Sequence, residues 1–183
     1  MRREIRFSGF GGQGIILSGF IVGKAATLGS GKYATLTRSY GPESRGGACS
    51  ANIVIEDIPN GYPEVEKPEV LVIMSQEAYE TAKKDLTDDM LIIVDEDLVI
   101  VDPAIKVNVI KAPFTRIANE LGKKLVANIV MIGFFTGATG IFDKSIILDS
   151  VLGSVPAKFK DLNVKAFEKG YELGLKVPRR VAA

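Results

Sequence analysis

The stretch FSGFGGQGII, residues 7–16, decides the expected fold. Gly9, Gly11 and Gly14 have the G-x-G-x-x-G spacing of a nucleotide-binding turn, and Gly12 adds a further glycine inside it. Glycines let a backbone approach a phosphate group closely, because no Cβ stands in the way. The spacing by itself is only moderately specific, so its structural context has to be considered.

The flanking residues supply that context. Residues 4–8 are typical of a short buried strand, and residues 14–29 carry apolar side chains at helical spacing. A helix that starts directly after such a turn points N–H groups and a partial positive charge at the turn. The sequence therefore predicts a strand, a glycine turn and a helix arranged as a candidate phosphate site.

An acidic residue is missing where a nicotinamide dinucleotide would need one. NAD-binding turns use an Asp or Glu about 20 residues further on, at the end of the second strand. No acid occurs between Glu4 and Glu43, and Arg38 stands near the end of the predicted strand over residues 33–39. This disfavours NAD and leaves two alternatives open: NADP, or glycines that only permit tight strand–helix packing. No G-x-x-x-x-G-K-[ST] motif is present.

A second informative stretch is TRSYGPESRGG, residues 37–47. It contains Arg38 and Arg45, and arginine forks suit phosphates and carboxylates. The loop follows the second predicted strand, so we expect it at the sheet edge where the glycine turn also opens. The alternative is a solvated hairpin loop in which Glu43 pairs with one of the arginines.

The rest of the chain predicts a three-layer α/β domain over residues 1–183, with a Rossmann-like mixed sheet flanked by helices. Residues 33–39 and 48–57 are expected to be antiparallel neighbours, since a short loop joins them. The apolar run at 69–75 is typical of a central parallel strand. The expected order is β-α-β-β-β-α-β-β-α-α-α-α. The expected helices include a buried one over 125–138, one capped by Asp143, and one whose apolar stripe is Val164, Phe167, Tyr171 and Leu175.

Composition excludes several kinds of chemistry. The 183 residues carry a net charge of +1, with one cysteine and no histidine. This chain alone therefore makes no intrachain disulfide, no cysteine-based zinc or iron–sulfur site and no His-dependent triad. The balanced charge gives no support for nucleic-acid or membrane binding. With no signal peptide or membrane-spanning stretch visible, we expect a cytoplasmic protein.

Two smaller features were weighed as sites. Cys49 could be a nucleophile, but without a histidine to activate it a small core residue is the better interpretation. Asp95, Glu96 and Asp97 could hold a metal ion, although solvated acids at a strand end are the simpler interpretation. We expect no catalytic residue and no metal ligand among them.

Together, the two stretches resemble the gamma subunit of 2-oxoacid:ferredoxin oxidoreductases, in the pyruvate/ketoisovalerate oxidoreductase catalytic domain family. The strand and helix EVLVIMSQEAY and the helix NIVMIGFFTGATG extend the resemblance over essentially the whole chain. It is strongest to gamma chains of the 2-oxoglutarate and branched-chain 2-oxoacid types. It implies oxidative decarboxylation of a 2-oxoacid, most simply 2-oxoglutarate, to acyl-CoA, with electrons passed to ferredoxin.

The resemblance also implies partners and a site. Thiamine diphosphate and iron–sulfur clusters would be held by alpha, beta and delta subunits, and this chain would pack over the thiamine site and help to bind coenzyme A. It would be inactive alone and could form a homodimer when isolated. The implied coenzyme A and partner contacts are Gly9, Gly11, Gly12, Gln13, Gly14, Arg38, Tyr40, Gly41, Arg45, Gly46 and Gly47.

Three other functions stay open on the sequence. One is a freestanding NADP-type reductase, although no substrate region or proton donor for it is recognisable. The second is a subunit of indolepyruvate:ferredoxin oxidoreductase. The third is a structural or assembly module without a ligand, in which Gly11→Ala would disturb folding and leave coenzyme A affinity unchanged.

Overall fold

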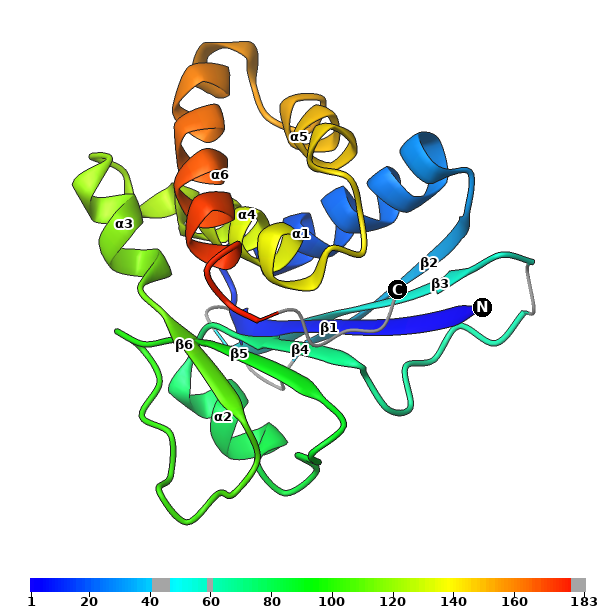
Figure 1. Cartoon of the computed structure of the whole chain (residues 1–183), viewed down its shortest axis with the longest axis vertical. Coiled ribbons are helices and arrows are strands. Elements are labelled where there is room, and N and C mark those ends of the chain that lie inside the picture. Colours follow the sequence, from blue (N-terminus) through cyan, green and yellow to red (C-terminus); the bar gives the residue numbers. More distant parts are fainter. Residues whose placement is uncertain (41–46, 59–60, 179–183) are drawn as a thin grey trace.

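A mixed sheet of six strands forms the centre of the molecule, in the order β2-β3-β1-β4-β5-β6 (Figure 1). The computed structural model describes residues 1–40, 47–58 and 61–178. Strands β1, β4, β5 and β6 are mutually parallel, and β3 is antiparallel to both β1 and β2. The strands are β1 (Arg2–Phe10), β2 (Tyr33–Tyr40), β3 (Ala48–Glu56), β4 (Val70–Ile73), β5 (Leu91–Asp95) and β6 (Val109–Ala112).

Helices cover both faces of this sheet. Helix α2 lies on one face, and the other α-helices of the described residues lie on the opposite face (Figure 1). They are α1 (Ile15–Lys24), α2 (Gln76–Ala82), α3 (Phe114–Glu120), α4 (Ala127–Thr139), α5 (Lys144–Leu152) and α6 (Lys160–Gly174). The predicted three-layer α/β fold and the predicted order of strands and helices are confirmed. None of the helices in these ranges is long and apolar enough to cross a membrane.

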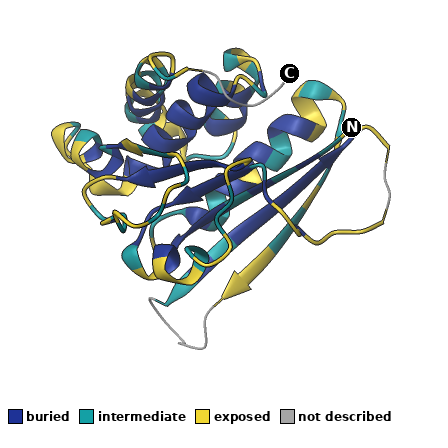
Figure 2. Cartoon of the chain, turned by 60° about the horizontal axis from the view of Figure 1, so that its bottom comes forward, coloured by how far each residue is buried: buried dark blue, intermediate teal, exposed yellow. Residues whose placement is uncertain are grey.

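Burial follows the pattern of the sequence across the sheet. All residues of β4 and β5 are buried, as their continuous apolar runs predict for central parallel strands. Strand β2 lies at an edge, and its last residues, from Arg38 to Tyr40, are exposed (Figure 2). The predicted antiparallel pairing of β2 with β3 is confirmed. The edge strand therefore carries its polar end out to solvent.

The place of β3 separates this sheet from a dinucleotide-binding one. In the classic dinucleotide fold the second strand lies directly beside the first, so its terminal acid reaches the ribose at the glycine turn. Here β3 lies between β1 and β2. Because neighbouring strands are about 4.8 Å apart, the end of β2 is roughly 10 Å from the end of β1. The absence of an acidic residue at the end of β2 therefore agrees with the structure, because this strand does not lie beside the glycine turn.

Helix α4 is the centre of the helical layer, and all its residues are buried. Phe135 contacts Phe7 of β1 edge to face, with ring centroids 5.6 Å apart. Phe134 contacts Phe114 of α3 in the same way, at 5.3 Å. Helix α6 covers the remaining side of α4 (Figure 1). This explains why the sequence of α4 is apolar nearly all round.

Glycines bring α4 and α6 into backbone contact. Gly133 and Gly137 of α4 face Gly170 and Gly174 of α6, and a Cβ at any of them would press on backbone atoms of the other helix. A Cβ on Gly137, for example, would lie 2.6 Å from the Tyr171 carbonyl oxygen. Small residues four apart let two helices approach this closely. The two short G-x-x-x-G patterns therefore fix the distance between these helices.

The predicted apolar stripe of α6 is only partly right. Phe167 is buried, but Leu175 is 50% exposed. The buried residues of the helix are Asn163, Ala166, Phe167, Gly170 and Gly174. The helical periodicity of the sequence points to the large apolar side chains. In the structure, the close contact with α4 places the small residues of α6 on its buried face.

Two helix ends also differ from the expectation. The helix expected over 14–29 is an α-helix only to Lys24, and Ala25–Gly29 continues it as a π-helix. Asp143 stands at the N-cap of α5, but its side chain makes no capping hydrogen bond. The predicted end of the first helix and the predicted start of α5 are correct to within a turn. The sequence did not reveal the hydrogen bonding at either place.

Replacing Gly170 by alanine should destabilise the fold strongly. The new Cβ would overlap the Val130 carbonyl oxygen, and backbone of a packed helix cannot move aside as a flexible side chain can. Overpacking of this kind costs about 2–4 kcal/mol, which corresponds to a fall in Tm of roughly 5–15 °C in a chain of this size. Thermal unfolding of the purified chain measures the change.

Gly23→Ala in α1 is the matched control. Its Cβ would make an ordinary contact, 3.9 Å from Ala34, so the exchange should be neutral or stabilise the helix by about 0.5–1 kcal/mol. If the two alanine variants melted at the same temperature, the close crossing of α4 and α6 would not be a major source of stability.

Candidate functional site

The two stretches singled out in the sequence are joined by a hydrogen bond. The backbone N–H of Gly11, in the glycine turn, donates to the carbonyl oxygen of Gly47 at 3.0 Å. Gly47 is the last residue of the second stretch and immediately precedes β3. The glycine turn and the end of the second stretch therefore lie side by side at the carboxyl end of β1.

Strand register brings Arg38 and Tyr40 to the same edge. Tyr40 pairs with Cys49, which pairs with Gly9 of β1. Arg38 lies two residues further back along β2, beside Ala51. Both side chains are exposed, and directly paired positions share one face of a sheet. The expected contacts Gly41, Arg45 and Gly46 lie outside the described residues.

The glycines of the turn serve different purposes. A Cβ on Gly9 would lie 2.5 Å from Oε1 of Gln13, and one on Gly14 would overlap the Asn128 side chain. These two glycines therefore permit close internal packing, as one interpretation of the spacing proposed. Gly12 has a φ of +94° and open space where a Cβ would stand. Of these three, Gly12 is the one that presents bare backbone to a ligand.

Gln13 holds the turn in shape. Its Oε1 accepts a hydrogen bond from the Phe10 N–H at 2.6 Å, and its Nε2 donates to the Met74 carbonyl oxygen at 2.7 Å. The side chain thus ties the turn to the residue that follows β4. Gln13 acts on the site through the shape of the turn, because both ends of its amide are already engaged.

Two helices begin at this edge and face the turn. Gly14 is the N-cap of α1, and Asn128, the second residue of α4, donates from Nδ2 to the Gly14 carbonyl oxygen at 3.4 Å. The first N–H groups of a helix have no partner within the helix, and its N-terminus carries a partial positive charge. The starts of α1 and α4 together make this edge favourable for an anion.

Lys123 and Lys124 add full positive charges, and the sequence analysis missed them. They precede α4, and neither forms an ion pair with any residue in the described ranges. A connection that follows a helix normally lies at the edge of the sheet opposite the glycine turn. Helix α3 has only seven residues, so the chain is still at the edge with the glycine turn when it reaches the lysines. The pair KK between two expected helices was the signal available.

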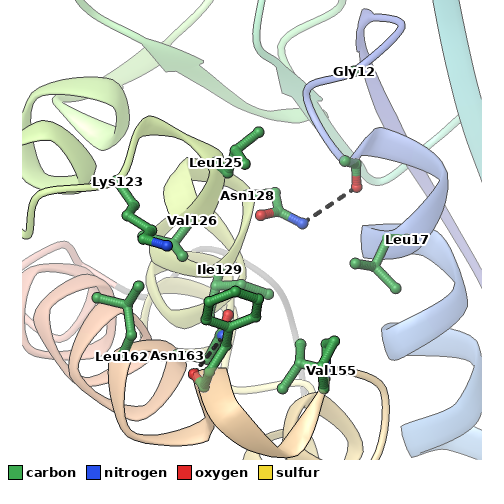
Figure 3. A pocket seen from close by; sticks show the side chains of 13 residues that line it. Gly12, Leu17, Lys123, Leu125, Val126, Asn128, Ile129, Val155, Leu162 and Asn163 are labelled. Atoms are coloured by element: carbon green, nitrogen blue, oxygen red, sulfur yellow. Dashed lines mark hydrogen bonds between the residues drawn. The ribbon is translucent and has the colours of Figure 1, made fainter.

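Two hollows adjoin the turn and share Gly12 and Leu125, and Figure 3 shows the larger one. The larger, of about 210 Å³, extends from Gly12 and Gly14 between α1 and α4 toward the connection between α5 and α6. The smaller, of about 130 Å³, lies beside Gln13 and Lys124. Leu125 stands between them and is 80% exposed. The edge therefore combines apolar cavities with cationic groups.

Cys49 has the properties of a core residue. It is buried, and burial raises the pKa of its thiol above the ordinary value. A thiol with a raised pKa is almost entirely protonated at neutral pH and is a poor nucleophile. The interpretation of Cys49 as a small core residue is confirmed, and the site offers binding groups and no activated nucleophile among the described residues.

Asp95 is not a solvated acid, so that interpretation is wrong for this residue. Its side chain is fully buried, and burial raises the pKa of the carboxyl group. Its oxygens accept from the Thr115 hydroxyl at 2.6 Å, the Thr115 N–H at 3.0 Å and the Asp97 N–H at 3.1 Å. Asp95 thereby fixes the start of α3. Glu96 and Asp97 are exposed and pair with Arg116.

Comparison with known families identifies the family to which this chain belongs. The sequence model of the family described as "Pyruvate ferredoxin/flavodoxin oxidoreductase" matches residues 4–173. The chain belongs to this family. A relative named 2-oxoglutarate synthase subunit KorC, from Methanocaldococcus jannaschii, is 51% identical over 176 residues, which is 94% of each chain. The resemblance inferred from the two motifs is confirmed.

Solved structures agree. The gamma subunit of a keto/oxoacid ferredoxin oxidoreductase from Geobacter sulfurreducens is 38% identical, with a TM-score of 0.83 over 94% of this chain and 98% of that one. The 2-oxoglutarate:ferredoxin oxidoreductase of Magnetococcus marinus also has a TM-score of 0.83, over 99% of this chain and 33% of a longer one. At 23% identity, the second likeness concerns the fold alone. The chain is a subunit of an oxidoreductase that acts on oxo acids with ferredoxin.

Replacing Gln13 by glutamate should destabilise the glycine turn. A carboxylate keeps the acceptor for the Phe10 N–H but cannot donate to the Met74 carbonyl oxygen, which it would repel. Leaving a buried acceptor without its donor costs about 1–3 kcal/mol. Chemical denaturation of the purified chain measures the free energy of unfolding.

Gln76→Glu, at the exposed start of α2, is the matched control. It makes the same chemical change and also loses its donor to a carbonyl oxygen, that of Ile100, and to the Glu80 carboxylate, but both contacts are exposed to water. We expect it to cost less than about 1 kcal/mol. Equal losses in the two variants would show that the Gln13 clamp has no special importance.

Proposed function

We propose that this chain is the gamma-type subunit of a 2-oxoglutarate:ferredoxin oxidoreductase, which converts 2-oxoglutarate oxidatively to an acyl-CoA. The choice of oxoacid is supported by the 51% identity to the KorC subunit of a 2-oxoglutarate synthase, over 94% of both chains. In this proposal the pocket for the oxoacid lies on partner subunits of alpha, beta and delta type. The glycine-turn edge of this chain binds coenzyme A.

The observation that carries the coenzyme A assignment is the gathering of cationic groups at one sheet edge. Coenzyme A bears a pyrophosphate and a ribose phosphate, so its nucleotide half is a multiply charged anion. The starts of α1 and α4, with Lys123 and Lys124, face the bare backbone of Gly12. Helix N-termini and lysines are the groups that proteins use for phosphates. Arg38 lies exposed two strands away, available to the same ligand or to a partner subunit.

The groups that carry out the redox chemistry do not fit the residues of this chain. A cluster needs several cysteine thiolates, and the sequence has one cysteine, which is buried. No group of three acidic, cysteine or histidine residues in the described ranges could hold a metal ion. Thiamine diphosphate supplies the decarboxylation chemistry when bound, and we assign it and the iron–sulfur clusters to partner subunits. This chain positions coenzyme A and packs over that centre.

Phosphate positioning is a task that these residues can perform through charge and polarity alone. A lysine supplies a positive charge, and the first N–H groups of a helix point their positive ends outward. The phosphates are remote from the reacting thiol, so contacts to them bind coenzyme A equally in the ground state and in the transition state. The expected contribution of this chain is therefore electrostatic binding of coenzyme A.

Neutralising Lys123 and Lys124 together should weaken coenzyme A binding. In the purified complex, Lys123→Gln with Lys124→Gln should raise the KM for coenzyme A about tenfold, because two charge-assisted phosphate contacts are lost. The kcat at saturating coenzyme A should be unchanged, since the contact is equal in ground and transition states. Steady-state kinetics with the oxoacid held in excess measure both constants.

Lys84→Gln, two residues after α2, is the control for the loss of a surface positive charge, because Lys84 is exposed and α2 lies on the other face of the sheet. It should leave the KM for coenzyme A within twofold of the wild-type value. A double variant with an unchanged KM would remove the lysines from the proposed site.

Arg45→Ala should lower turnover of the complex without unfolding the chain. The prediction rests on the two arginines of residues 37–47 and on the hydrogen bond between Gly47 and the glycine turn. Turnover and coenzyme A dependence are measured on the variant complex, and thermal unfolding on the variant chain. Full turnover with normal coenzyme A dependence would show that Arg45 has no such role.

The experiment that tests the whole proposal is anaerobic affinity purification of this chain from its native host. Co-purifying chains are identified, and bound thiamine diphosphate, iron and sulfide are assayed. Partners that carry these groups, with activity on 2-oxoglutarate, support the proposal. A lone chain free of both would contradict it and direct attention to binding of NADPH.

A further inference from the structure

A further hollow lies on the face of the sheet that α2 covers (Figure 1). Its volume of about 440 Å³ exceeds that of either hollow beside the glycine turn. The lining comes from β1 and β4, from the residues just before β4 and β5, and from the end of α2 and the turn after it. None of the described residues that we assign to coenzyme A belongs to this lining. The hollow is therefore separate from the glycine-turn edge.

Arg6, in the middle of β1, places a positive charge in this hollow. Its Nε donates to Oδ1 of Asn52 at 2.6 Å, and its Nη2 donates to the Val65 carbonyl oxygen at 3.1 Å. Both acceptors are neutral, and Arg6 forms no ion pair within the described part of the chain. Burial lowers the pKa of the guanidinium below its ordinary value, although the Asp85 carboxylate acts in the opposite direction. The hollow thus contains a half-buried cation without an anionic partner.

Asp85, from the turn after α2, is the matching negative charge in the lining. Its side chain is exposed and forms no ion pair with any residue that the structure describes. The other charged groups of the lining already have partners. Lys67 pairs with Asp89 at 2.7 Å, and Glu66 accepts from a tyrosine hydroxyl at 3.2 Å. One cation and one anion are therefore available to a ligand.

The remaining wall of the hollow is mainly apolar. Leu71 and Met90 belong to a hydrophobic cluster that α2 forms with β4 and β5, and Leu86 packs against this cluster. Pro68 and Ala82 also line the hollow. The volume of about 440 Å³ lies within the roughly 300–1,000 Å³ that is typical of small-molecule pockets. The hollow accordingly has room for a small metabolite that carries one apolar group.

We propose that this hollow binds a free α-amino acid with an apolar side chain. The carboxylate of the amino acid pairs with Arg6, its ammonium group pairs with Asp85, and its side chain lies against Leu71 and Met90. A zwitterion carries one charge of each sign, which matches the two groups of the lining that have no ion-pair partner. The inference goes beyond the proposed function and does not rest on it, because neither the oxoacid nor coenzyme A takes part.

Charge favours a zwitterion over other occupants of the hollow. A dicarboxylate or a nucleotide would bring surplus negative charge beside Asp85 and Glu66, and juxtaposed like charges are unfavourable. An acidic side chain of a partner subunit would pair with Arg6 but leave Asp85 without a cation. An amine without a carboxylate would leave Arg6 unpaired. Occupation by a partner side chain is the alternative that the experiment has to separate.

The test measures binding of L-leucine to the purified full-length chain by isothermal titration calorimetry. Two analogues each lack one of the charges: L-leucinamide has no carboxylate, and 4-methylpentanoate has no ammonium group. Each should bind about tenfold more weakly than L-leucine, because one charge-assisted contact is lost. L-Glutamate, which has a second carboxylate in place of the apolar group, should also bind about tenfold more weakly.

Substitutions of the two charged residues assign each contact. Asp85→Asn changes an exposed side chain and should weaken L-leucine about tenfold without weakening 4-methylpentanoate, which has no ammonium group. Asp88→Asn, at an exposed acid outside the lining, is the matched control and should bind L-leucine as wild type does. Arg6→Lys keeps the charge but loses the planar fork, so it should weaken L-leucine and 4-methylpentanoate several-fold and leave L-leucinamide unchanged.

Four results would overturn the amino acid site. They are no binding of L-leucine up to roughly 10 mM, equal affinity for L-leucine and both analogues, unchanged affinity in Asp85→Asn, and binding to the isolated chain that is lost in the assembled complex. The last result would identify the hollow as a contact with a partner subunit. None of the four concerns turnover of the oxoacid or dependence on coenzyme A. Failure of this proposal is therefore distinguishable from failure of the proposed function.

Discussion

The contact between the backbones of α4 and α6 is the constraint on which the functional edge depends. Four glycines remove the side chains that would otherwise separate the two helices. Helix α4 is thereby held in the centre of the helical layer, buried on every side. This fixes the position of the first turn of α4, where Asn128 contacts Gly14. It also fixes the position of the two lysines that precede the helix. The packing of α4 against α6 thus sets the geometry of the glycine-turn edge.

The sheet shows how a common turn is put to another use. A strand, a glycine turn and a helix form a phosphate site in any α/β protein, because the helix start and the bare backbone supply its polarity. Recognition of a nicotinamide dinucleotide needs the end of the neighbouring strand as well. Here the antiparallel strand β3 occupies that place, and Arg38 of β2 lies beyond it. The proposed phosphate contact at the turn is compatible with this arrangement, whereas a ribose contact from the neighbouring strand is not.

The sequence predicted local features well and relations between distant segments less well. Alternation and apolar runs gave every strand and helix in order, because burial on one or both faces determines those patterns. The two motifs were expected at one edge, and the bond between Gly11 and Gly47 confirms it. The roles of Gly9 and Gly14 could not be foreseen, since each depends on the side chain that the fold brings against it. Asp95 was misjudged because two of its three hydrogen-bond donors come from a helix start 20 residues further on.

The same limit explains why two lysines of the candidate site were not foreseen. Lys123 and Lys124 carry no motif, and their place is apparent only in the structure, where a short α3 leaves them lining the same hollows as Gly12. Phosphate-binding turns are recognised from sequence because the backbone does the work and glycines mark it. Cations and rings that complete such a site can come from any loop that ends nearby. This chain has no histidine, and its one cysteine is buried. The groups that it can offer to a reaction are therefore mainly backbone N–H groups and cations. Under the proposed function, its contribution to catalysis is therefore the positioning of coenzyme A.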